Sequence, residues 1–129
     1  QYVGLSQWDV LPSAFHLPGI QGGWFAMPSP TRVEQFRERF QSVYGSAPHP
    51  LAAIAYDGVA AVGASVATGN RDALNSKGLT LTGGFQGSAG IFRLRKDGTI
   101  ERGLAVATIA GNQVVVLEEA PRDFSNFGF

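Results

Sequence analysis

The sequence predicts a mixed α/β fold, and the prediction depends on where helical and strand patterns occur. Residues 31–44 place apolar side chains at helical spacing, and residues 51–67 form an apolar run of helical length. Short apolar runs at residues 2–6 and 24–27 predict strands before these helices. From residue 89 onward, alternating apolar and polar residues between glycine-containing turns predict further strands. Strands interspersed with helices in this way are typical of α/β proteins.

Composition indicates one folded unit over residues 1–129. Apolar residues make up 44% and charged residues 16%, which is enough apolar material for a core. Ten basic residues balance ten acidic ones, which argues against nucleic-acid binding. The lack of cysteine excludes disulfides, thiolate nucleophiles and cysteine-ligated metals. No apolar run is long enough to cross a membrane, and the abrupt, strand-like start leads us to expect a piece of a longer protein.

The two main helices are expected to pack differently. Thr31 and Glu34 have the spacing of a capping box, and Gly45 is placed to end the amphipathic helix that they begin. The helix over 51–67 is apolar on nearly all sides and has Asp57 as its only formal charge. Such a helix is expected to be buried on most of its surface.

Smaller elements complete the prediction. A short helix is expected over residues 70–74, and Trp24 is expected in the core. Strands are predicted over 91–95, 100–110 and 113–118, joined by Asp97-Gly98 and Gly111-Asn112 turns, so the chain should close with an antiparallel hairpin or meander.

No pattern supports catalysis, a metal or a cofactor. The glycines at 84, 87 and 90 lack the spacing of a phosphate-binding loop, and a strand rather than a helix follows them. His16 and His49 are far apart and lie beside prolines, and no nucleophile has a partner base. We therefore expect a protein that is not an enzyme.

Two places are candidates for ligand binding. Ser6, Gln7 and Trp8 follow a short strand, where open α/β sheets usually bind ligands; a loop with one packed tryptophan explains them equally well. Tyr56 lies beside Asp57 on the apolar helix. Because an unpaired buried charge is costly, a structural hydrogen bond is the favoured role for Asp57 over ligand contact.

The order of these features resembles the carboxy-terminal region of the type I periplasmic binding proteins, the Leu/Ile/Val-binding class. This resemblance implies part of a Rossmann-like layered α/β fold with two lobes, and a hinge-like crossing near residues 28–30. The stretches that carry it are "VGLSQW", "GGWFAMPSP", "RVEQFRERFQSVYGSAPHPLAAIAYDGVAAVGASVA" and "GFQGSAGIFRLRKDGTIERGLAVATIAGNQVVVLE".

Within that class, "GIFRLRKDGTIERGLAVATIAGNQVVVLEEAPRDF" is most similar to the end of penicillin-binding protein activators, the LppC/LpoA-type lipoproteins. That similarity implies a periplasmic, non-enzymatic regulator that acts on a peptidoglycan synthase, whose parent protein is an outer-membrane lipoprotein. The alternative is the substrate-binding receptor of an ABC transporter for amino acids or another small polar solute.

The resemblance also implies which segments would contact a ligand. They are Ser6-Gln7 and the start of the second helix at Leu51. Leu51 is aliphatic where transport receptors often have an aromatic residue, and Gln7 is uncharged where amino-acid receptors often have a carboxylate. Because parts of both lobes would be missing from this chain, we expect it to self-associate, by exchanging strands or helices.

Overall fold

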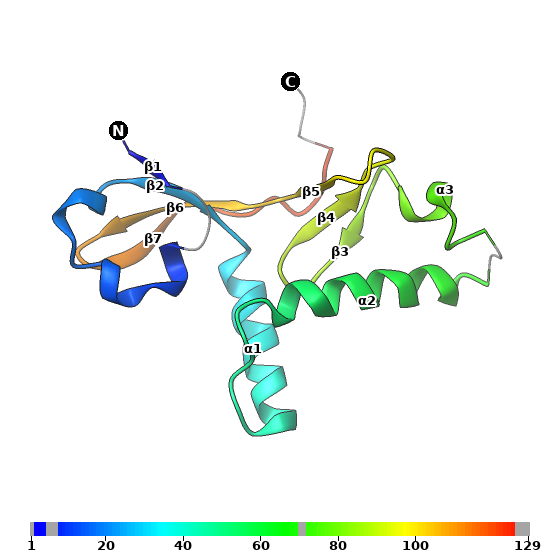
Figure 1. Cartoon of the computed structure of the whole chain (residues 1–129), viewed down its shortest axis with the longest axis horizontal. Helices are drawn as coiled ribbons and strands as arrows, with labels where there is room; N and C mark the ends of the chain where they lie inside the picture. Colours follow the sequence, from blue (N-terminus) through cyan, green and yellow to red (C-terminus); the bar gives the residue numbers. More distant parts are fainter. Residues whose placement is uncertain (1, 5–7, 70–71, 126–129) are drawn as a thin grey trace.

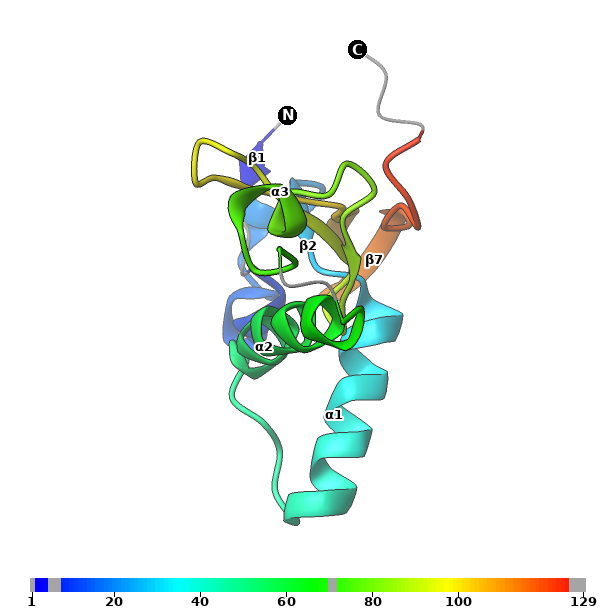
Figure 2. The ribbon, with the colours of Figure 1, turned by 90° about the vertical axis from the view of Figure 1, so that its right-hand side faces the viewer.

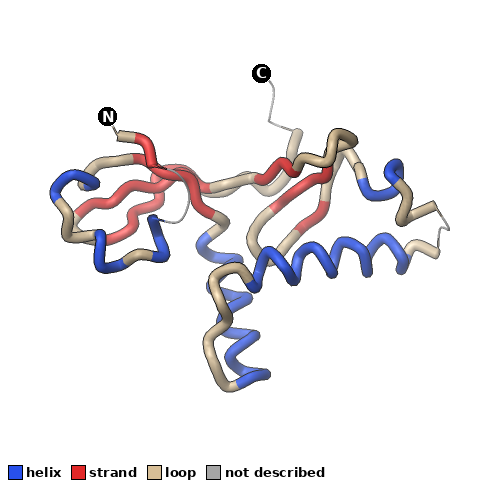
Figure 3. Tube along the Cα trace, viewed as in Figure 1, coloured by secondary structure: helices blue, strands red, loops and turns tan. Residues whose placement is uncertain are grey.

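The computed structural model describes residues 2–4, 8–69 and 72–125, and every structural statement below concerns these residues. They form a mixed α/β fold, as predicted, and their strands make two separate sheets (Figures 1 and 3). Sheet A has the strand order β1-β2-β6-β7 and sheet B the order β3-β4-β5. Figure 1 shows sheet A at one end of the molecule, sheet B above α2 at the other, and α1 descending between them.

Sheet A contains the apolar core. β1 (Val3–Gly4) is parallel to β2 (Trp24–Met27), whereas β6 (Ala105–Ala110) is antiparallel to both β2 and β7 (Gln113–Glu118). The β6–β7 pair is the predicted antiparallel hairpin. The buried core residues come from β2 and β6; they are Phe25, Met27, Ala105, Ala107 and Ile109. Three 3-10 turns, η1 (Trp8–Val10), η2 (Pro12–Ala14) and η3 (Pro18–Ile20), lie between β1 and β2. From this segment, Trp8 of η1, Phe15 directly after η2 and Ile20 of η3 pack against the core.

Trp24 was expected in this core and is instead 48% exposed. Side chains alternate between the two faces of a strand, so a strand that points Phe25 and Met27 inward points Trp24 outward.

Sheet B is smaller and ends where the chain changes sheets. It consists of β3 (Phe85–Gln86), β4 (Ile91–Leu94) and β5 (Ile100–Arg102). The single strand predicted over 100–110 is therefore wrong: β5 ends at Arg102, and β6 begins at Ala105 in the other sheet. At the break, the Gly103 amide donates to the Ile91 carbonyl at 2.9 Å. A Cβ on Gly103 would lie 2.6 Å from Ile91 and 2.7 Å from Pro121, so only glycine fits this close approach.

The helices differ from prediction at their ends. α1 (Pro30–Tyr44) begins after Ser29, with no side-chain cap, so Thr31 lies inside the first turn and the predicted capping box does not form. Gly45 ends α1 in the left-handed conformation, at φ 73°, as predicted. The short helix expected over 70–74 is instead α3 (Ser76–Leu79), because the Asn75 side chain caps it by accepting from the Gly78 amide; residues 70–71 of that prediction lie outside the described residues.

α2 (Ala52–Ala67) departs most from its predicted burial. Only four of its residues are buried, in a single stripe: Ala53, Asp57, Ala61 and Ser65. Figure 2 shows sheet B and its loops on one side of α2, and there Ala53 and Asp57 accept hydrogen bonds from Ser88. Most of the other residues of α2 are exposed. No helix among the described residues is long and apolar enough to span a membrane.

Within the described residues, the chain passes between the two sheet regions at three places. Pro28 and Ser29 lead from β2 to α1, and Gly103 and Leu104 lead from β5 to β6. After β7 the chain returns to sheet B, where the Arg122 carbonyl accepts from the side-chain amide of Gln86 at 2.7 Å. The Arg93 guanidinium there lies 4.4 Å from the centre of the Phe124 ring.

Candidate functional site

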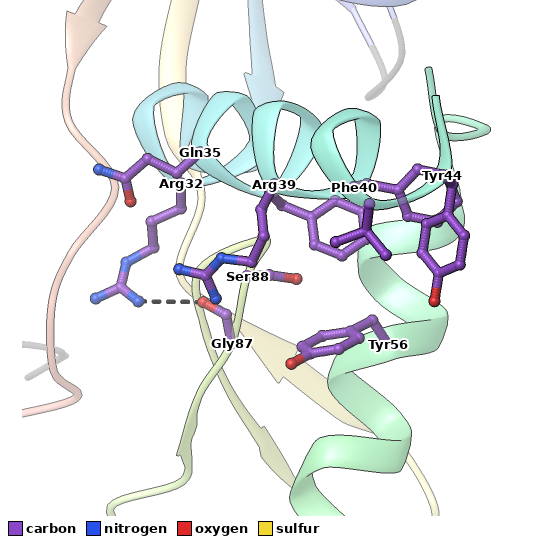
Figure 4. A pocket seen from close by; sticks show the side chains of 10 residues that line it. Arg32, Gln35, Arg39, Phe40, Tyr44, Tyr56, Gly87 and Ser88 are labelled. Atoms are coloured by element: carbon purple, nitrogen blue, oxygen red, sulfur yellow. Dashed lines mark hydrogen bonds between the residues drawn. The ribbon is translucent and has the colours of Figure 1, made fainter. Parts of the chain in front are cut away.

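A groove of about 440 Å³ lies between α1 and α2 (Figure 4). We call it the α1–α2 groove. Aromatic and arginine side chains of α1 form one wall, Tyr56 of α2 faces them, and the turn between β3 and β4 completes the lining. The lining residues are Arg32, Gln35, Phe36, Arg39, Phe40, Val43, Tyr44, Tyr56, Gly87 and Ser88.

Stacked aromatic rings form the apolar side of the groove. Phe36, Phe40 and Tyr44 follow one another at a spacing of four residues, which places them on one face of α1. The ring centres of Phe36 and Phe40 are 5.9 Å apart, and those of Phe40 and Tyr44 are 4.5 Å apart. The Tyr56 ring of α2 lies 5.5 Å from Phe36 and joins the two helices. These tilted contacts are favourable aromatic geometries.

Two arginines supply positive charge in the groove. Arg32 is held in place by the Gly87 carbonyl at 3.1 Å and by the Gln86 side-chain oxygen at 3.0 Å. The Arg39 guanidinium forms no ion pair or hydrogen bond with any described residue, and Figure 4 shows this side chain extending toward Gly87 and Ser88. A guanidinium without a partner beside aromatic rings is suited to bind a carboxylate.

Arg37, on the same helix, provides a contrast. Its Nε lies 2.9 Å from a carboxylate oxygen of Glu34 on the exposed side of α1. The hydrogen bonds from Arg37 lower the pKa of Glu34, and the pKa of Arg37 is raised in return. Arg37 is thus occupied outside the groove, whereas Arg39 is available within it.

Asp57 fixes the turn that borders the groove. This carboxylate is 1% exposed and accepts from the Ser88 amide at 2.5 Å, the Ser88 hydroxyl at 2.7 Å and the Ala89 amide at 3.0 Å. A Cβ on Gly87 would lie 2.3 Å from Asp57 Oδ2, so the turn approaches the carboxylate as closely as glycine permits. The Ala89 carbonyl in turn accepts from the Ser29 amide at 3.1 Å. Asp57 therefore has the structural role that its burial predicted.

Among the described residues, the predicted ligand contacts Trp8, Leu51 and Tyr56 do not line one common groove. Ser6 and Gln7 lie outside the described residues. Trp8 packs on the core of sheet A, with its ring centre 5.7 Å from that of Phe25. Leu51 is 52% exposed and immediately precedes α2. Of these residues only Tyr56 lines the α1–α2 groove, and no contact links it to Trp8 among the described residues.

Sequence reasoning missed the α1 side of the groove. The spacing of Phe36 and Phe40 indicated a helix face that packs into a core, which did not distinguish a closed core from an open groove. Among the described residues, no three His, Asp or Glu side chains come close enough to form a metal site.

Comparisons with known proteins identify the fold. No family model and no curated protein sequence matches the chain. A solved structure from Rhodospirillum rubrum, assigned as a branched-chain amino acid ABC transporter, superposes with a TM-score of 0.71 at 21% identity and covers 89% of this chain. The leucine-binding protein LivK from Thermotoga maritima superposes with a TM-score of 0.56 at 18% identity and covers 92% of it.

The chain spans about a third of the length of these proteins, 36% of each. Both similarities extend over most of the present chain. The chain therefore has part of the type I periplasmic-binding-protein fold.

Proposed function

We propose that this chain is the carboxy-terminal part of a two-lobed solute-binding protein that serves an ABC transporter. The similarity in fold to a branched-chain amino acid transporter protein and to a leucine-binding protein supports this proposal. The passage of the chain between its two sheets at three places fits a molecule with two lobes. In this proposal the protein acts in the periplasm, and the crossing at residues 28–30 is part of the hinge.

The α1–α2 groove carries the proposal, because it combines an unpaired cation with an apolar wall. The Arg39 guanidinium is placed to bind the carboxylate of a solute. The rings of Phe36, Phe40 and Tyr56 are placed to contact its apolar part, with the Tyr56 hydroxyl as a further polar group. The solute class that fits is a small carboxylic acid with an aliphatic or aromatic side chain.

The other predicted contacts stay predictions within this proposal. Ser6, Gln7 and Leu51 are the positions where the family resemblance places ligand contacts, and they remain part of the proposal. The resemblance to penicillin-binding protein activators does not gain support from the comparisons. Regulation of a peptidoglycan synthase is accordingly not our leading hypothesis.

Titration calorimetry with leucine, phenylalanine, benzoate and glucose would test the proposal. We expect the carboxylates to bind and glucose, which lacks a carboxylate, not to bind. Replacing the unpaired arginine, Arg39→Gln, should weaken carboxylate binding by about tenfold, the loss expected for one charge-assisted contact. Arg37→Gln removes an equal charge from the same helix outside the groove and should leave the affinity unchanged.

Three outcomes would contradict parts of the proposal. Absence of binding by all three carboxylates would exclude the function for this chain. Equal losses in the two arginine variants would indicate a general charge effect rather than a site. If binding were unchanged in Arg39→Gln but lost in Leu51→Lys, the binding site would lie at the start of α2 and not in the groove.

A further inference from the structure

α2 presents an unusual surface, because its one charged residue is buried and most of its apolar side chains are exposed. Asp57 and Ser65 are buried, and no charged side chain lies on its exposed surface. The exposed residues include Val59 at 75%, Val62 at 44% and Val66 at 54%. An extended apolar surface of this kind on a folded protein marks an interaction site.

The spacing of these exposed residues identifies the kind of partner. Steps of three and four residues alternate along a line that begins at the half-buried Ala52 and continues through exposed residues; its members are Ala52, Ala55, Val59, Val62 and Val66. We call these five residues the α2 seam. Side chains at this spacing form a continuous line along a helix, which packs against another helix with a shallow crossing angle. The seam therefore fits a helix better than a strand or a small molecule.

The seam is also complementary to itself. Alanines occupy its amino-terminal half and valines its carboxy-terminal half. In an antiparallel pair of α2 helices centred on Val59, Ala55 of one copy faces Val62 of the other, and Ala52 faces Val66. On both sides of the central Val59 pair, large side chains then pack against small ones, which is the arrangement that fills an interface without voids. A parallel pair would instead place alanine opposite alanine and valine opposite valine.

Electrostatics does not oppose such a pair. The seam carries no charge, and the whole chain has ten basic and ten acidic residues, so two copies do not repel each other strongly. Figures 1 and 2 show sheet B on one side of α2, and on the other side α1 and the loop that joins α1 to the start of α2. The larger part of the seam is thus open to a partner.

We propose that the α2 seam binds a second copy of this chain, in an antiparallel, two-fold symmetric helix pair. In such a contact each surface meets its own symmetry mate, so one self-complementary seam is sufficient. A single helix pair buries a small area, so the dimer should form and dissociate with concentration.

Sedimentation velocity across a wide range of concentrations would test this proposal. The wild-type chain should shift from monomer to dimer as concentration rises. Val59→Lys places two like charges at the symmetry axis and should weaken the dimer by well over tenfold. Leu117→Lys adds the same charge at the exposed edge strand β7, where Leu117 is 50% exposed, and should have no effect. Circular dichroism should show both variants folded, because both positions are exposed.

Disulfide cross-linking would test the antiparallel geometry separately. The chain contains no cysteine, so each introduced cysteine reports on one position. Val59→Cys should cross-link to itself, whereas Val66→Cys should cross-link only when mixed with Ala52→Cys, because disulfides require closely spaced Cα atoms. Cross-linking of Val66→Cys with itself would overturn the antiparallel arrangement.

Two results would overturn the seam as a self-association site. If the chain stayed monomeric at every concentration, the seam would not bind a second copy and would have to bind a different polypeptide. A dimer that Leu117→Lys dissociates and Val59→Lys does not would indicate pairing through the edge of sheet A.

Discussion

The two sheet regions of this molecule are stabilised by different means. Sheet A has an apolar core of its own, in which Phe25, Ala107 and Ile109 are at most 1% exposed. The sheet B region also buries Ile91 and Phe92, but α2 joins it through small side chains and one carboxylate. Apolar burial depends mainly on area, whereas a buried carboxylate depends on the exact placement of its donors.

This difference explains why α2 can remain attached while most of its surface is exposed. Little apolar area is buried by the small side chains Ala53, Ala61 and Ser65. The three hydrogen bonds to Asp57 instead attach the helix to the turn at Ser88 and Ala89. The same turn contacts Ser29 at one of the crossings between the sheets. The stability of the sheet B region is therefore expected to depend on single polar side chains. The stability of sheet A is expected to depend on the volume of its core side chains.

The largest expected effect is the loss of Phe25. Phe25→Ala should lower the free energy of unfolding by about 3–5 kcal/mol, because it removes a large side chain from a core that cannot collapse around the space. Chemical denaturation followed by tryptophan fluorescence would measure it, since Trp8 packs on Phe25. Trp24→Ala, on the opposite face of the same strand, should cost much less. Similar losses in the two variants would contradict the assignment of the core to one face of β2.

Removal of the Asp57 carboxylate should have the next largest effect and act locally. Asp57→Ala leaves the Ser88 and Ala89 amides buried without acceptors and should cost about 2–4 kcal/mol. Hydrogen exchange should accelerate at these amides and along α2, while sheet A stays protected. Gly87→Ala should produce the same local pattern, because its Cβ would collide with the carboxylate. Uniform acceleration across both sheets would show that the two regions unfold together.

The sequence predicted the secondary-structure elements well and the burial of their side chains poorly, and α2 shows why. Its length, its apolar composition and the need of Asp57 for a partner were all evident from residues 51–67. Hydropathy, however, reports what a surface prefers and not whether anything covers it. The same limit applies to the groove: Tyr56 was predicted as a contact, but Arg39 could not be chosen over Arg37 without knowing which of the two pairs with Glu34.

The smallest expected effect is on the pH dependence of the strand pair β4–β5. Glu101 lies between two arginines, with one carboxylate oxygen 2.8 Å from Arg93 Nε and 3.0 Å from Arg95 Nε. Hydrogen bonds from Arg93, and then from Arg95, lower the pKa of Glu101. A lowered folded-state pKa contributes stability that is fully present above the unfolded value, about 4.3, and is lost as the pH falls through the lower folded value.

Glu101→Gln should accordingly reduce the loss of stability on acidification, with little change to sheet A. Thermal melts of the wild type and the variant between neutral and acidic pH would measure this, and added salt should reduce the difference because the pair is partly solvated. Glu118→Gln on β7 is the matched control, since Glu118 is exposed and forms no ion pair with any described residue. If both variants changed the loss of stability at acidic pH equally, the effect would reflect net charge alone. The ion pairs of Glu101 would then not distinguish sheet B from sheet A.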